Sequence, residues 1–220
     1  MAAETFAGPG LVGRFRSRQS GHPSGLVGRI FGRAMVRDTA DANDRALQLL
    51  AVNRPSTVVE VGFGQGRTVG LLVERGHRVL GVDSSLTMVR QAVARNRAAC
   101  GDGRAVLRHG DGVTIPFPDG VADAALSVHT VYFLPDLVGT LTDLARVVRP
   151  GGLLVIACRT SDTPVPGWMD PAVYQVPTAG HLIGMLSSAG YERVDVQVVE
   201  GGPDALHLFT ARVGTTPTPS

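Results

Sequence analysis

The chain of 220 residues contains no lysine, so its positive charge comes from arginine and histidine. This absence excludes the phosphate-binding loop G-x-x-x-x-G-K-[ST], which requires a lysine. Only two cysteines occur, Cys100 and Cys158, and they form neither a CxxC pair nor a cluster with histidine. We therefore expect neither a structural zinc site nor any other bound metal.

Long apolar runs and a large charge imbalance are also missing. No hydrophobic run approaches the roughly 20 residues of a membrane helix, and residues 1–20 lack the continuous apolar segment of a secretion signal. The net charge of +2 is too small to indicate a nucleic-acid partner. With 44% hydrophobic residues, the sequence predicts a globular protein. We expect it to be cytoplasmic, because no secretion signal is seen, and to be a monomer or homodimer.

Strands and helices alternate along most of the chain. The predicted strands cover residues 57–61, 77–83, 104–110, 121–129, 151–159, 191–200 and 206–213. The predicted helices between them cover 66–76, 85–99 (capped by Ser84 or Ser85), 135–148 and 178–189. This alternation predicts a seven-stranded, mostly parallel α/β sheet with helices on both faces. The last two strands are too close for a parallel crossover, so strand 7 should be antiparallel.

The sequence before residue 55 differs from the rest. Helices are predicted over 25–37 and 39–51, and the first carries arginines on one face and apolar residues on another. We divide the chain into an N-terminal arm with these helices (1–54), a ligand-binding domain (55–213) and a disordered tail (214–220).

A glycine-rich turn follows the first strand of the sheet. The segment VVEVGFGQGRTVG, residues 58–70, contains the pattern G-x-G-x-G at Gly62, Gly64 and Gly66. The dinucleotide fingerprint G-x-G-x-x-G is not matched, because Arg67 stands at its last position. Such a turn brings backbone close to a ligand at the carboxyl edge of the sheet.

Three carboxylates at strand ends indicate the charge of that ligand. Glu60 would repel a pyrophosphate and suits a ligand with an ammonium or sulfonium group, unless it instead binds amides of the loop. Asp83 can accept both hydroxyls of a ribose. Asp111 can accept from an adenine amino group while the Gly112 amide donates to the ring. S-adenosylmethionine combines all of these groups and contains no phosphate.

At these residues the chain resembles the class I S-adenosylmethionine-dependent methyltransferases, in particular the branch that includes quinone-biosynthesis enzymes. The similar segments are VVEVGFGQG, GVDSSLTMVRQA, HGDGVTIPFPDGVADAALSVHTVYFLPD and RVVRPGGLLVIA, within residues 55–212. The resemblance implies a Rossmann-like three-layer α/β/α sandwich with an N-terminal helical lid. It also implies the cofactor-binding residues Glu60, Gly62, Gly64, Gly66, Asp83, Ser84, Met88, Asp111, Gly112 and His129. Met88 could equally fill the core.

Candidates for the chemistry are fewer. His129, at the end of the fourth strand, could be a general base, or it could hold the cofactor or the strand backbone. His22, in the expected lid, is a weaker candidate. Trp168 and Tyr174 could form a wall for an apolar acceptor, or anchor their loop. The resemblance implies an enzyme that transfers the methyl group of S-adenosylmethionine to a small-molecule acceptor by in-line displacement. A nicotinamide-dependent oxidoreductase and a non-catalytic S-adenosylmethionine-binding protein are the alternative functions.

Overall fold

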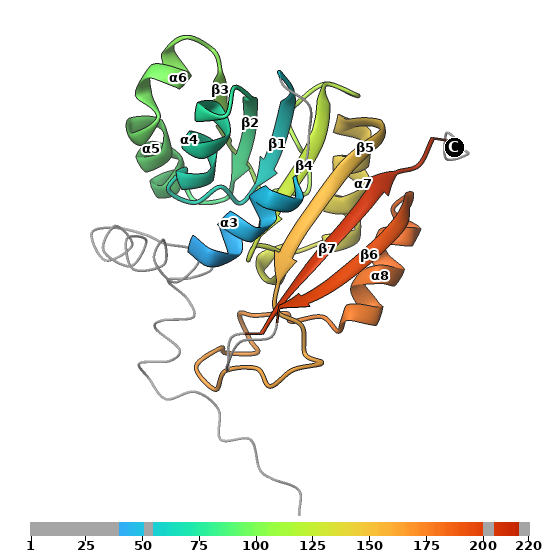
Figure 1. Cartoon of the computed structure of the whole chain (residues 1–220). Coiled ribbons are helices and arrows are strands. Elements are labelled where there is room, and N and C mark those ends of the chain that lie inside the picture. Colours follow the sequence, from blue (N-terminus) through green and yellow to red (C-terminus); the bar gives the residue numbers. More distant parts are fainter. Residues whose placement is uncertain (1–39, 51–54, 200–204, 216–220) are drawn as a thin grey trace, which may run out of the picture.

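The computed structural model describes residues 40–50, 55–199 and 205–215. They form a seven-stranded sheet in the order β3-β2-β1-β4-β5-β7-β6 (Figure 1). Six strands run parallel, and β7 is antiparallel to both of its neighbours, β5 and β6. The strands are β1 Thr57–Val61, β2 Arg78–Asp83, β3 Ala105–His109, β4 Ala122–Val128, β5 Val148–Cys158, β6 Tyr191–Val199 and β7 Leu206–Val213. The predicted sheet and its antiparallel last strand are therefore confirmed.

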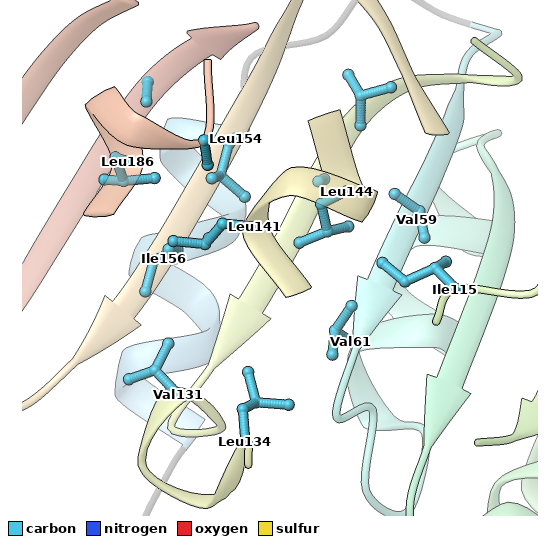
Figure 2. Packing of buried hydrophobic residues seen from close by; sticks show 14 of the residues in the cluster. Val59, Val61, Ile115, Val131, Leu134, Leu141, Leu144, Leu154, Ile156 and Leu186 are labelled. Atoms are coloured by element: carbon cyan, nitrogen blue, oxygen red, sulfur yellow. The ribbon is translucent and has the colours of Figure 1, made fainter. Parts of the chain in front are cut away.

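Helices cover both faces of this sheet, which gives the predicted three layers. One face packs against α3 (Ala40–Leu49), α4 (Arg67–Glu74), α5 (Leu86–Arg95) and α6 (Arg97–Gly101). The other face packs against α7 (Leu137–Val147) and α8 (Ala179–Ser188), where Leu141 and Leu186 meet Leu154 and Ile156 of β5 (Figure 2). Apolar residues alternate along β1 between the two cores, because successive side chains of a strand point to opposite faces.

The helix predicted over 85–99 is two helices in the structure. Its N-cap is Ser85, whose hydroxyl accepts from the Met88 amide, so Ser84 is not the cap. Asn96 interrupts the helix, and its buried amide donates to the carbonyls of Ala92 and Gly66 at 2.9 Å each. The break between the two helices is therefore where Asn96 hydrogen-bonds to the glycine turn. The helical pattern of the sequence gives no sign of this break.

Helix α3 corresponds to the predicted helix over 39–51. It buries Ala42, Ala46 and Leu47 against the core and packs over β4, β5 and β7. We therefore group α3 with the sheet rather than with a lid. The lid helix predicted over 25–37, together with His22, lies outside the described residues, as does most of the predicted tail. Within the described ranges, no helix is long and apolar enough to cross a membrane.

Candidate functional site

The glycine turn connects β1 to α4 through three residues with positive φ. The φ angles of Gly62, Gly64 and Gly66 are 78°, 54° and 72°. Residues other than glycine adopt such positive φ angles only at a cost in conformational free energy. The turn is fixed by the Gly62 amide, which donates to the Val82 carbonyl at 2.8 Å. A Cβ added at Gly62 would lie 2.1 Å from Thr130 Oγ1, whereas one at Gly64 would meet nothing within 4 Å. The middle of the turn is therefore open.

Glu60 lies just before this turn and is 3% exposed. Thr68 of α4 hydrogen-bonds its side chain, but Oε2 has no hydrogen-bond partner among the described residues. Burial, with a smaller contribution from the charge of Asp83, raises the pKa of the Glu60 carboxyl to about 8. A carboxylate in this position would be stabilised by a positively charged ligand group.

Asp83 connects the end of β2 to the glycine turn. Its Oδ2 accepts from the Gly64 amide and its Oδ1 from the Ser85 amide, both at 2.8 Å. A carboxylate offers about four acceptor sites in all, which is the kind of group that vicinal ribose hydroxyls require. Asp83 thus both shapes the turn and meets the chemical requirement of the predicted role.

The third carboxylate, Asp111, follows β3 and is exposed. Its Oδ1 accepts from the amides of Val113 and Thr114 at 2.9 and 3.2 Å, which closes a turn around Gly112. The φ of Gly112 is 83°, and an added Cβ would lie 2.9 Å from Leu134. Because β3, β2 and β1 are adjacent and parallel, the three carboxylates lie along one edge of the sheet.

Ser84 and Met88, which are both predicted to flank the adenosine, differ in their exposure to solvent. Ser84 is exposed, and its carbonyl is 3.1 Å from His109 Nε2. Met88 is only 3% exposed, which agrees with the alternative that it fills the core. Any contact of Met88 with a ligand would need to be made from within the packed layer.

His129 follows β4 on the same edge. Its φ of 53° lies in the left-handed region, which is uncommon for a residue other than glycine. The His129 amide donates to the Ala157 carbonyl at 2.8 Å, and its Nδ1 lies 3.1 Å from the Tyr132 hydroxyl. The next residue, Thr130, packs against Gly62. The end of β4 therefore contacts the glycine turn directly.

An aromatic cluster lies beyond His129. The short helix η1 (Val131–Phe133) and the loop after β5 contribute its four rings, which are Tyr132, Phe133, Trp168 and Tyr174. Tyr174 is in contact with the other three, with ring centroids 4.8–5.8 Å apart. The structure thus brings Trp168 and Tyr174 near His129. Tyr132 and Phe133 were missed, although the aromatic pair in HTVYFLPD directly follows the fourth strand.

Among the residues that the structure describes, no three histidines, cysteines or carboxylates form a group that could hold a metal ion. Cys158 is buried in β5, and burial raises the pKa of its thiol to about 12. That thiol is therefore protonated and unreactive at neutral pH.

Comparison with known proteins agrees with this geometry. Residues 59–156, from β1 to β5, match the family model described as a methyltransferase domain. In this match and in the relatives below, the chain is similar to the class I S-adenosylmethionine-dependent methyltransferases. A demethylmenaquinone methyltransferase of Tropheryma whipplei is 36% identical over 114 residues, 50% of this chain and 45% of that protein. The 27-O-demethylrifamycin SV methyltransferase of Amycolatopsis mediterranei is 27% identical over 119 residues, 54% of this chain and 44% of that protein. The chain thus spans about half the length of these curated relatives.

Solved structures show the same fold. An S-adenosylmethionine-dependent methyltransferase of Aquifex aeolicus aligns with a TM-score of 0.62 and 23% identity, over 78% of this chain and 89% of that one. The [4+2]-cyclase SpnF aligns with a TM-score of 0.67 and 18% identity, over 93% and 96% of the two chains. Since a cyclase shares the fold of this chain, the fold alone does not determine the reaction.

Proposed function

We propose that this protein transfers the methyl group of S-adenosylmethionine to a small-molecule acceptor. The observation that carries the proposal is Glu60, a buried carboxyl beside the open glycine turn, one oxygen of which has no hydrogen-bond partner in the described part of the chain. A cationic ligand would stabilise its ionised form, whereas a pyrophosphate would be repelled. The charges and the turn therefore fit S-adenosylmethionine better than a dinucleotide.

In this proposal the cofactor lies along the ends of β1, β2 and β3. Glu60 and the glycine turn hold its methionine end, Asp83 holds the ribose, and Asp111 with Gly112 holds the adenine. Ser84 and Met88 flank the adenosine, and His129 lies beside the sulfonium. S-adenosylmethionine would supply a methyl group already activated for displacement.

The acceptor approaches from the opposite half of the edge. Trp168 and Tyr174 belong to the aromatic cluster and would bind an apolar or aromatic molecule. Methyl transfer is an in-line displacement, so holding the acceptor atom against the methyl group supplies much of the rate enhancement. The menaquinone and rifamycin relatives support a small organic acceptor. The cytoplasmic location, the absence of a metal and the monomeric or dimeric state stay predictions.

Ligand binding tests the proposal. S-adenosylhomocysteine should raise the melting temperature of the full chain, while NAD(H) should leave it unchanged. The reverse pattern would instead support the nicotinamide-dependent oxidoreductase. A response to S-adenosylhomocysteine without methyl transfer to any quinol or phenol tested would favour a protein that binds the cofactor without catalysis.

A substitution identifies the binding surface. Asp83→Ala removes a charged acceptor for two hydroxyls, so affinity for S-adenosylhomocysteine should fall about 10- to 150-fold, equivalent to roughly 1.5–3 kcal/mol. Titration calorimetry measures this loss, and Asp102→Ala, at an exposed ion pair with Arg104, is the matched control. An unchanged affinity in a folded Asp83→Ala variant would exclude the ribose role.

A further inference from the structure

The hydroxyl of Tyr132 joins two elements at the end of β4. Tyr132 is 2% exposed, and its Oη accepts a hydrogen bond from the backbone amide of Arg159, just after β5. The same oxygen lies 3.1 Å from His129 Nδ1. A buried phenol is therefore in direct contact with the imidazole at the ligand edge.

Counting protons fixes the direction of these hydrogen bonds. A backbone amide can only donate, so Tyr132 Oη is the acceptor in the bond from Arg159. Burial raises the pKa of the Tyr132 phenol well above its ordinary value, so the phenol keeps its proton at neutral pH. That proton needs an acceptor, and His129 Nδ1 lies within reach.

We infer that Tyr132 holds His129 as the tautomer with its proton on Nε2, so that the imidazole donates a hydrogen bond at the active edge and does not act as a general base. Tyr132 is then a positioning residue. A base would need a lone pair on Nε2 and hence a proton on Nδ1. The proton on Nδ1 and the proton of the Tyr132 hydroxyl would then point at each other. The phenol would have lost Nδ1 as the acceptor of its hydrogen bond.

The inference narrows the class of acceptor, and this step rests on the proposed function. A hydrogen-bond donor at Nε2 suits an acceptor that presents a carbonyl or an ionised hydroxyl oxygen. The donor would hold that oxygen while the neighbouring nucleophilic atom, or the ionised oxygen itself, attacks the methyl group. Such an acceptor needs no base on the protein at the moment of transfer.

Nitrogen spectroscopy of the full chain without ligands tests the tautomer. With ¹⁵N-labelled histidine, long-range ¹H–¹⁵N spectra should show His129 protonated on Nε2 at neutral pH, its signals being assigned by their loss in His129→Gln. In Tyr132→Phe, the imidazolium of His129 should appear at a higher pH than in the unmodified protein, and the two tautomers should mix. Tyr191→Phe is the matched control, because it removes another buried phenol, which donates to the Leu141 carbonyl at 3.1 Å.

Three results would overturn the inference. They are a His129 protonated on Nδ1, a titration unchanged by Tyr132→Phe, and an equal shift in Tyr191→Phe. If Tyr132→Phe does not fold, the unmodified protein still decides, because the spectrum of His129 itself shows which ring nitrogen carries the proton. These spectra require neither cofactor nor acceptor. A chain that fails to bind S-adenosylhomocysteine would therefore refute the proposed function and leave the tautomer standing.

Discussion

The two halves of the ligand edge differ in the chemistry of their side chains. The ends of β1, β2 and β3 carry a glycine turn and three carboxylates, of which Glu60 and Asp83 are buried. The ends of β4 and β5 carry His129 and the aromatic cluster. The charged half suits a cofactor with fixed cationic and hydroxyl groups, whereas the aromatic half suits an apolar acceptor. One fold can thus keep its cofactor half and change its substrate half.

The largest expected effect lies where the halves meet, at Gly62 and Thr130. Gly62→Ala should destabilise the protein by roughly 2–5 kcal/mol, because it combines a positive φ with overpacking against Thr130. Gly64→Ala is the matched control and should cost only about 1–2 kcal/mol, since its added methyl group meets no neighbour. Urea unfolding of the three proteins measures the difference.

A second variant isolates the steric contribution. Thr130→Ala combined with Gly62→Ala should recover part of the lost stability, because the Thr130 side chain is the group that the new methyl group would meet. Equal losses in the two single glycine variants would show that the halves are less tightly packed than the structure indicates.

Glu60 should make the charged half sensitive to pH. Its pKa is raised to about 8 in the folded chain, above its ordinary value of 4.5, so the folded state binds the proton more tightly. Stability from this group is complete below the unfolded pKa and is lost as the pH rises towards 8. Between pH 5 and 8 the unliganded protein should lose about 3 kcal/mol relative to Glu60→Gln.

Urea unfolding at several pH values compares the two proteins. S-adenosylhomocysteine, whose ammonium group would favour the ionised Glu60, should reduce the loss at high pH. If Glu60→Gln and the unmodified protein show parallel profiles from pH 5 to 8, the buried carboxyl does not titrate as inferred.

The smallest expected effect comes from Trp168→Ala, which tests whether the aromatic half takes part in cofactor binding. Trp168→Ala should lower stability by at least about 0.5–1.5 kcal/mol, the contribution of its edge-to-face pair with Tyr174. Affinity for S-adenosylhomocysteine should stay within about twofold, because the ring belongs to the acceptor half. Calorimetry checks the affinity, and Trp168→Phe, which retains an aromatic ring, is the control. A tenfold loss of cofactor affinity would remove the distinction between the halves.

Much of the charged half could be predicted from the sequence because its signals are local. Glu60 is in a strand of β-branched residues, and the three glycines directly follow that strand. Asp83 is the last residue of the next strand. The alternation of predicted strands and helices likewise indicated the parallel sheet. The break at Asn96 was not predictable, since its hydrogen bond to Gly66 spans 30 positions.

The sequence by itself determined the parallel sheet, the antiparallel last strand and the position of the glycine turn, because each depends on neighbouring residues. Only the tertiary structure decided that Thr130 packs on Gly62, that Glu60 is buried with an unpartnered oxygen, and that Tyr132 contacts His129. The aromatic cluster also joins residues from two separate segments. Burial and long-range contacts are set by how whole layers pack, so no short pattern of residues specifies them.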